Sequence, residues 1–389
     1  MLGVLSAGHL VNDIHQGSLP ALLPFLITKH GISYAAAAGI IFSFTISSTL
    51  IQPVFGHLAD RFSKKWVIPA GLFLASSGLA MTGFVPNYLF LVLVVMLSGI
   101  GSAAFHPEAA RYVNFAGAER KASAMSIFGV GGTMGFALGP ILITTSVLVW
   151  GLKGTLIVLI PSTVAAVMIL FQSSRLTTLE RTEKTRVELL PSALNEDNWG
   201  AFGRLSLTII GKSVLFYGLL TFIPLYWVYV LHQSEAAGAA ALSLFSVSGV
   251  FGNLMGGRLA DRFGNVKILI TGCALLIPTL PALVWTSNVY VATLLLIPVG
   301  GFFSMTYGPT IVLGQKYLPN HIGLSSGMTM GVAFTFGGMA APLLGTLADH
   351  HGIWFALASI AFIPVLITGM ACTLPSARSI APAPLETDS

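Results

Sequence analysis

Charged side chains are scarce in this sequence. Asp, Glu, Lys and Arg make up 8% of the 389 residues, whereas 54% of the residues are hydrophobic. Soluble domains usually carry about 25% charged residues, because they must present a solvated surface. The scarcity excludes an ordinary soluble domain, and the mean hydropathy of +0.84 indicates that most of the surface faces lipid.

Cysteine is almost absent as well. Cys273 and Cys372 both fall in apolar stretches, so we expect neither a disulfide nor a metal-binding role for them. The sequence has no His-Glu-x-x-His pattern, no Cys/His cluster, no nucleotide-binding loop and no Gly-x-Ser-x-Gly motif. We therefore expect no metal site, no cofactor and no enzyme activity, and we exclude a self-contained ATP-driven pump.

Long hydrophobic runs dominate the chain instead. A helix of ~20 residues crosses the ~30 Å hydrocarbon core of a bilayer, and the short alternating segments of a β-barrel are missing. The sequence predicts an all-α membrane protein with twelve transmembrane helices. Their expected ranges are 3–28, 34–56, 66–84, 88–112, 121–148, 153–172, 205–231, 236–256, 267–286, 289–313, 322–347 and 353–374. The first stretch contains Asn12 and Asp13 and has no A-x-A-like site, so we expect it to be retained rather than removed as a signal peptide.

The distribution of positive charge predicts the orientation. With the N-terminus inside, sixteen of the 19 Lys and Arg residues fall in cytoplasmic segments, Lys29 and Lys153 lie outside, and Lys212 lies within a span. Short cytoplasmic loops carry an excess of Lys and Arg. We therefore expect a multi-pass protein of the cell inner (cytoplasmic) membrane with both termini in the cytoplasm. The net charge of +5 then faces the inner leaflet and implies no nucleic acid partner.

The domain organisation follows from one polar stretch and one repeat. We expect a six-helix bundle at 1–172, a cytoplasmic linker at 173–204, a second six-helix bundle at 205–375 and a disordered tail at 376–389. Gly56-His-Leu-Ala-Asp-Arg-Phe62 returns 201 residues later as Gly257-Arg-Leu-Ala-Asp-Arg-Phe263. Gly139-Pro140 is matched by Ala341-Pro342 at an offset of 202. Such repeats are typical of secondary transporters and predict two pseudo-symmetric bundles.

The repeated loop resembles the signature of the major facilitator superfamily, G-x-L-a-D-r-x-g-r-k, between helices two and three. That resemblance implies a loop that latches the cytoplasmic side, because the acidic residue can hold a neighbouring helix N-terminus. The alternative is a solvated loop that only sets topology. The residues we expect to act in gating are Gly56, Asp60, Arg61, Gly257, Asp261 and Arg262, together with Gly135, Gly139 and Pro140 on the fifth helix.

A narrower resemblance covers nearly the whole chain. His9-Leu-Val-Asn12-Asp13, Gly101-Ser-Ala-Ala-Phe-His106-Pro-Glu108, the segments 126–132 and 138–140, and Ile322-Gly-Leu-Ser-Ser-Gly327 look like the fosmidomycin-resistance subfamily of drug exporters. This resemblance implies drug efflux in exchange for protons, and antibiotic resistance.

Two positions depart from the patterns of drug exporters. Val95 stands where the helix-four pattern R-x-x-q-G has arginine, and Ile143 and Thr144 replace the last glycines of the helix-five antiporter pattern. Proton coupling must therefore rest on other residues.

Ionisable groups inside the predicted spans are the first candidates, because a charge in a bilayer is costly and usually functional. Asp13 lies about 15 Å into the first span by helical rise, and His9 shares its helix face four residues earlier. Lys212 maps through the repeat offset to within a residue or two of Asp13. We expect Asp13 and Lys212 to face each other across a central cavity and, with His9, to couple transport to protons. A static Asp13–Lys212 ion pair is the alternative.

Other polar residues of the spans are candidates for lining a substrate cavity. Glu108 and Arg111 could form a local bridge, an inner gate or a substrate contact, and Pro107 predicts a kink beside them. The full set is Asn12, His15, Gln16, Gln52, His106, Glu108, Arg111, Tyr217 and Asn253.

The favoured function is a proton-coupled antiporter that exports a small drug-like molecule by alternating access. The alternative is a symporter or uniporter for a small organic anion or sugar, with Lys212 and Arg111 binding the anion. A membrane-embedded enzyme or a transport-like receptor finds no supporting motif. The expected partners are a small-molecule substrate, protons and the lipid bilayer, and we expect a monomer.

Overall fold

The structure is a computed structural model of the chain. It describes residues 1–52, 54–55, 66–117, 121–172, 174–178, 196–321, 325, 328–329 and 333–375. All regular elements that these residues form are helices.

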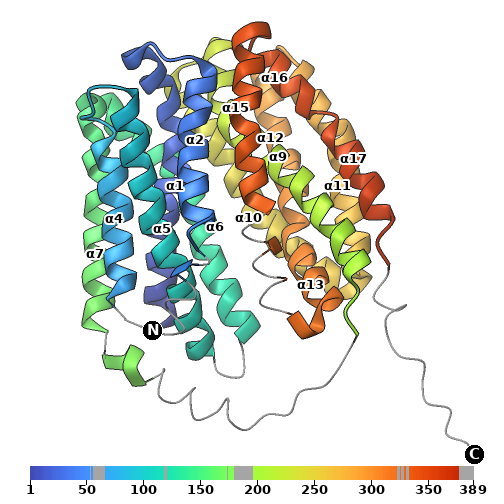
Figure 1. The fold of residues 1–389 in the computed structure, drawn as a ribbon. Helices are drawn as coiled ribbons and strands as arrows, with labels where there is room; N and C mark the ends of the chain where they lie inside the picture. The colour runs from blue at the N-terminus through green and yellow to red at the C-terminus, as the bar shows by residue number, and fades with distance from the viewer. Residues whose placement is uncertain are drawn as a thin grey trace, which may run out of the picture.

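The first half of the chain forms one group of helices, drawn in blue to green in Figure 1. Each element corresponds to a predicted span, and the sixth span enters through the short helix η1. The elements are α1 (Leu2–His30), α2 (Tyr34–Thr49), α4 (Val67–Met81), α5 (Tyr88–Gly117), α6 (Lys121–Trp150), η1 (Gly151–Val158) and α7 (Leu159–Phe171).

The second half forms the other group, drawn in yellow-green to red (Figure 1). Helix α9 begins before the predicted boundary at 205, and the tenth and twelfth spans are each divided into two helices. The elements are α9 (Trp199–Tyr229), α10 (Glu235–Phe263), α11 (Asn265–Trp285), α12 (Val289–Met305), α13 (Tyr307–Tyr317), η2 (Pro319–His321), α15 (Ala333–His351), α16 (Ile353–Ile360) and α17 (Ile363–Cys372).

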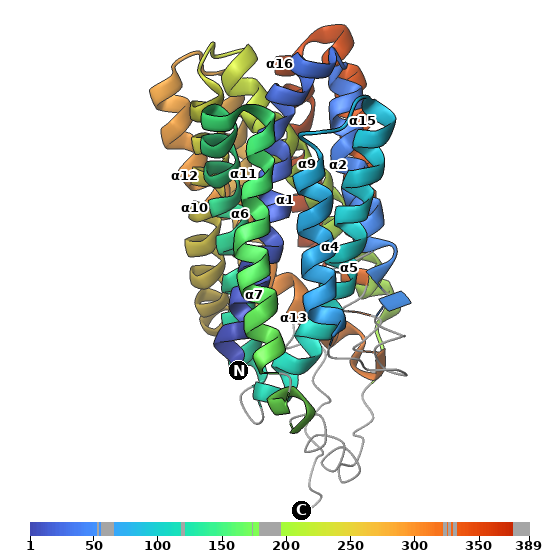
Figure 2. The same cartoon turned by 90° about the vertical axis from the view of Figure 1, so that its left-hand side faces the viewer.

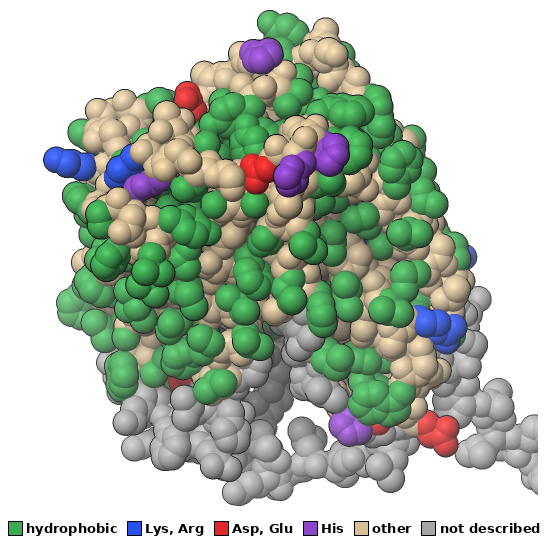
Figure 3. Space-filling view, turned by 45° about the horizontal axis from the view of Figure 1, so that its top comes forward, with side chains coloured by type: hydrophobic (Ala, Val, Ile, Leu, Met, Phe, Trp, Pro, Cys, Tyr) green, Lys and Arg blue, Asp and Glu red, His purple; other side chains and the backbone are tan. Residues whose placement is uncertain are grey.

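Within the described residues, seven helical runs are long and apolar enough to cross a membrane. One of them, Ile127–Phe171, runs through two predicted spans, and α2 and α4 are shorter apolar helices. Large apolar side chains such as Leu89, Phe171 and Leu343 are 64%, 83% and 73% exposed. Figure 3 shows hydrophobic side chains over the broad middle of the surface, with charged and histidine side chains toward its two ends. This distribution suits a molecule whose sides contact lipid.

Helices α1 and α6 pack along a seam of glycines. A Cβ at Gly131, Gly135 or Gly139 would collide with the backbone oxygen of Ser6, Leu10 or Ile14, respectively. Both series advance by four residues, about one helical turn, so the backbones approach each other over successive turns. The seam holds the polar face of α1 at a fixed depth beside α6.

The two groups of helices meet at the end opposite the N-terminus, which we call the outer end. In Figures 1 and 2 the ribbons of α2 and α15 lie side by side, and in Figure 1 the two groups separate toward the N-terminus, the inner end. Asp349 of α15 accepts hydrogen bonds from the backbone nitrogens of Tyr34 (2.7 Å) and Ala35 (2.9 Å), at the start of α2. Farther along, the hydroxyls of Thr49 and Thr335 are 2.7 Å apart.

Candidate functional site

A carboxylate with two imidazoles lies inside the first group of helices. Asp13 of α1 is 5% exposed. Its Oδ2 lies 3.3 Å from Nε2 of His9, and its Oδ1 lies 3.2 Å from Nε2 of His106. We call His9, Asp13 and His106 the His–Asp–His cluster. It forms because His9 precedes Asp13 by one helical turn, while α5 packs against α1 and supplies His106.

The orientation of both imidazoles is set by backbone carbonyls. Nδ1 of His9 lies 2.7 Å from the carbonyl oxygen of Phe128, and Nδ1 of His106 lies 3.0 Å from that of Ser102. A carbonyl oxygen can only accept, so each Nδ1 must carry a proton and donate it. Each short contact between Nε2 and an Asp13 oxygen therefore needs a second proton between the two atoms, and Nε2 presents a lone pair only when that proton has left.

Neighbouring side chains hold the cluster rigidly. The side-chain nitrogen of Asn12 donates to Asp13 Oδ1 (3.1 Å) and to the Ser102 hydroxyl (3.0 Å), which joins α1 to α5. The His9 ring stacks on Phe128 with centroids 4.0 Å apart. A Cβ at Gly132 would lie 2.5 Å from His9 Cε1 and 2.6 Å from Asp13 Oδ2, so α6 needs glycine there.

The predicted pair of Asp13 and Lys212 is not formed. Lys212 of α9 is 8% exposed, but its Nζ lies 3.5 Å from the Thr310 hydroxyl and 5.6 Å from the centre of the Phe303 ring. The ion pairs of Asp13 are with His9 and His106 instead. The repeat offset only compares positions along equivalent helices. It could not show that nearer groups on α1 and α5 surround the carboxylate.

Among the other cavity candidates, His15 and Glu108 are buried and have partners outside the cluster. Nε2 of His15 lies 3.1 Å from the Ser162 hydroxyl of α7. Glu108, which is 1% exposed, lies 3.7 Å from Arg111 in an ion pair within α5. Arg111 also lies over the Phe115 ring at 5.3 Å. Glu108 and Arg111 therefore make the local bridge that was one of their three predicted roles.

Tyr217 is 2% exposed and belongs to the main hydrophobic core. Gln16, Gln52 and Asn253 are partly buried. A Cβ at Gly308 would lie 3.9 Å from Oδ1 of Asn253, which puts that amide beside α13.

Some of the gating candidates lie within the described residues and others do not. Gly56, Asp60 and Arg61 lie outside the described residues. Asp261 and Arg262 are exposed near the end of α10, and Arg262 lies over the ring of its neighbour Phe263 at 5.2 Å. The remaining candidates keep predicted gating roles: Gly257, Gly135, Gly139 and Pro140.

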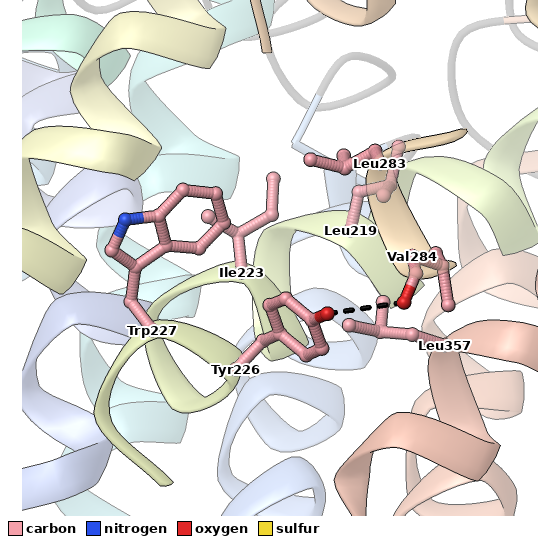
Figure 4. Close-up of a pocket in the computed structure, with 7 residues that line it drawn as sticks. All are labelled: Leu219, Ile223, Tyr226, Trp227, Leu283, Val284 and Leu357. Carbon is pink, nitrogen blue, oxygen red and sulfur yellow. Dashed lines mark hydrogen bonds between the residues drawn. The ribbon is translucent and has the colours of Figure 1, made fainter. Parts of the chain in front are cut away.

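A small apolar pocket lies away from the His–Asp–His cluster, between α9, α11 and α16 (Figure 4). Its only hydrogen bond among the drawn residues joins the Tyr226 hydroxyl to the carbonyl oxygen of Val284, at 3.0 Å. Its lining residues are Leu219, Ile223, Tyr226, Trp227, Leu283, Val284 and Leu357. None of them is charged, so this pocket offers no chemistry for coupling.

Sequence reasoning expected no metal site. In the described part of the chain, the ligand atoms of His9, Asp13 and His106 lie within 4.8 Å of one another, close enough to hold a metal ion. Sequence reasoning also missed Ser102, Phe128 and Gly132 as supports of the cluster. The tetrapeptide around His106 was the available signal, but its direction toward Asp13 depends on how α1 and α5 pack.

An all-helical bundle with a lipid-facing surface and a buried charged cluster defines a polytopic membrane transporter. The model of the Major Facilitator Superfamily matches residues 5–342. The chain belongs to the major facilitator superfamily.

Relatives with similar sequences agree. The chain is 29% identical over 376 residues to the Fosmidomycin resistance protein of Escherichia coli (strain K12), covering 94% of this chain and 90% of that protein. It is 28% identical over 385 residues to the uncharacterized MFS-type transporter YfnC of Bacillus subtilis (strain 168), covering 98% and 94%.

Solved structures share the fold at lower identity. A bacterial homolog of the human lysosomal transporter Spinster, in an inward-facing and occupied conformation, has a TM-score of 0.78 at 14% identity, covering 98% of this chain and 96% of that one. A D-xylose-proton symporter has a TM-score of 0.72 at 18% identity, covering 97% and 98%.

Proposed function

We propose that the protein is a proton-coupled antiporter that exports a small drug-like molecule from the cytoplasm. The observation that carries this proposal is the buried carboxylate of Asp13, which has two imidazoles at 3.2 and 3.3 Å in the middle of a transporter bundle. An ionisable group at such a position is costly and is typical of ion pathways. Similarity to the Fosmidomycin resistance protein over 94% of the chain supports export as the direction.

The proposed cycle uses alternating access. The two helix groups contact each other at the outer end through the start of α2 and Asp349 of α15. In Figure 1 the ribbons of the two groups separate toward the inner end. These features favour an inward-facing state, in which substrate enters from the cytoplasm. The two bundles, at 1–172 and 205–375 with the linker 173–204 between them, then rock to open the outer end, and the tail at 376–389 takes no part.

Asp13 is the proposed proton carrier, and His9 and His106 are its partners. When the outer end opens, a proton from outside binds the cluster and weakens the hold on the outgoing molecule. When the inner end opens, the proton leaves to the cytoplasm. We propose that Lys212 contributes the counter-charge in a state other than this one, in which it lies against Thr310.

The alternative is a symporter or uniporter for a small organic anion or sugar. One observation favours it: within the described part of the chain, no carboxylate lies within 4 Å of the Lys212 ammonium, which contacts the Thr310 hydroxyl and the Phe303 ring. A buried cation of this kind can receive an anionic substrate.

Transport by the protein reconstituted in proteoliposomes with an imposed pH gradient tests the proposal. We expect an acid-outside gradient to drive export of a compound from a panel that includes fosmidomycin. In Asp13→Asn, uphill transport should fall to the level of empty liposomes, while downhill exchange persists.

His30→Gln is the matched control. His30 is the last residue of the same helix and lies about 25 Å from Asp13 by helical rise, so its variant should keep gradient-driven transport. Undiminished uphill transport by Asp13→Asn would falsify the carrier assignment. Accumulation of proton and solute on the same side would favour the symporter.

A further inference from the structure

We propose that His9, Asp13 and His106 form a binding site for a divalent transition-metal ion. This inference goes beyond the proposed function, because it concerns binding and holds for either direction of transport. Two imidazole nitrogens and one carboxylate oxygen are ligands that Zn²⁺, Co²⁺ and Ni²⁺ accept.

The distances fit an ion placed among the three groups. Ligand atoms about 2.0–2.2 Å from a tetrahedral zinc ion lie roughly 3.3 Å from one another. The Nε2 atoms of His9 and His106 lie 3.3 and 3.2 Å from the two oxygens of Asp13. All three ligand atoms lie within 4.8 Å of one another, so small side-chain rotations would close them around an ion.

The imidazoles are already oriented as metal ligands usually are. A ligating histidine donates its other ring N–H to a carbonyl or carboxylate, which fixes the tautomer and directs the free lone pair at the metal. His9 does this through Phe128 at 2.7 Å, and His106 through Ser102 at 3.0 Å. Asn12 likewise holds Asp13 Oδ1 at 3.1 Å. The side chains would therefore lose little conformational freedom on binding.

The exposed fractions indicate how an ion would reach the site. The side chain of His106 is 23% exposed, against 12% for His9 and 7% for Asp13. The ion would enter beside His106, and three protein ligands leave a fourth position for water or another small ligand. Because two of the three ligands are imidazole nitrogens, the site should prefer these metals to Mg²⁺ and Ca²⁺, which bind oxygen ligands.

All three ligands belong to the first group of helices, on α1 and α5. Rocking of one bundle against the other leaves their mutual distances unchanged. Metal affinity should therefore be insensitive to which end of the transporter is open.

The test is metal binding to the purified full-length protein in detergent, with any affinity tag removed. Co²⁺ is titrated while the visible absorption of the ligand field is recorded, and Zn²⁺ is then used to displace it. We expect about one ion per chain and a tetrahedral-type Co²⁺ spectrum. His9→Gln and His106→Gln should each lower affinity by at least about tenfold.

Two controls keep the result decisive. His15→Gln removes a buried histidine of the same helix, and His350→Gln removes one of two adjacent surface histidines at the end of α15. Both should bind Co²⁺ as the wild type does. Thermal unfolding of every variant identifies those that are misfolded.

Several results would overturn the proposal. They are the absence of Co²⁺ and Zn²⁺ binding by the wild type, unchanged affinity in folded His9→Gln and His106→Gln, and loss of binding in His350→Gln instead. Because the assay uses no pH gradient and no transported compound, its outcome is independent of whether Asp13 carries protons during export.

Discussion

Asp13 can be buried because neighbouring side chains form hydrogen bonds with its carboxylate. A buried charge without partners costs several kcal/mol in a protein interior. The oxygens of Asp13 are met by His9, His106 and Asn12, which all lie on α1 or α5. Asp13, His9, His106 and Asn12 therefore form one polar unit. A substitution in contact with one of them should displace the other side chains as well.

Gly132→Ala tests that unit at the scale of one residue. The added Cβ would lie 2.5 Å from His9 Cε1 and 2.6 Å from Asp13 Oδ2, so both side chains must move. We expect overpacking to lower the free energy of unfolding by about 1–3 kcal/mol and to reduce both Co²⁺ affinity and gradient-driven transport.

Gly129→Ala is the matched control, because a Cβ at Gly129 on the same helix meets nothing within 4 Å. Thermal unfolding and transport assays compare the two variants. Equal behaviour of both would contradict the close packing of α6 on the His–Asp–His cluster.

Helices α2 and α15 form one contact between the two halves at the outer end. Asp349 accepts hydrogen bonds from two backbone nitrogens at the start of α2. These are groups that a helix leaves without internal partners, and the positive end of its dipole favours a carboxylate. A Cβ at Gly345 would lie 2.6 Å from Cα of Ala35, so the helices touch closely beside this bond. We call this contact between Asp349 of α15 and the start of α2 the outer latch.

Asp349→Ala should loosen the outer latch. Loss of such a capping interaction costs about 1 kcal/mol, which shifts a two-state equilibrium about fivefold. We expect an impermeant thiol reagent, applied from outside, to modify Thr45→Cys about fivefold faster in this background. Thr45 of α2 is buried, and its side chain lies against Gly338 of α15. The exposed Cys372 is replaced by serine beforehand.

Glu196→Ala serves as the control for the latch, because Glu196 is an exposed acidic residue that precedes α9 and lies on neither α2 nor α15. Its labelling rate should match that of the parent. If Asp349→Ala also labels at the parent rate, Asp349 does not hold the outer end closed.

The whole molecule is proposed to sit in the inner membrane with both termini in the cytoplasm. Positive side chains concentrate in the segments on that side of the predicted topology. An even number of spans requires both termini to lie on the same side of the membrane.

A protease-cleavable tag at the C-terminus tests this orientation. We expect cleavage in inside-out vesicles and protection in sealed right-side-out vesicles, because only the cytoplasmic face is accessible in the first. Cleavage in intact right-side-out vesicles would reverse the assigned topology.

The sequence by itself determined the elements of this protein. Hydrophobic length set the spans, and the described helices lie where they were expected, although α9 begins at Trp199 and several spans are divided. The spacing of Gly131, Gly135 and Gly139 by four residues places them on one helix face, where a Cβ would collide with Ser6, Leu10 and Ile14, respectively. The spacing of His9 and Asp13 also predicted that they would meet. These features are local, because they depend on helical geometry within one segment.

Only the tertiary structure decided which residues complete the cluster. His106 is far from Asp13 in the chain and reaches it at 3.2 Å because α5 packs against α1. Lys212 was matched to Asp13 by the internal repeat, yet it lies against Thr310. Contacts between helices depend on how each helix is rotated about its axis and on the side chains between them, and neither follows from the spacing of residues along one helix.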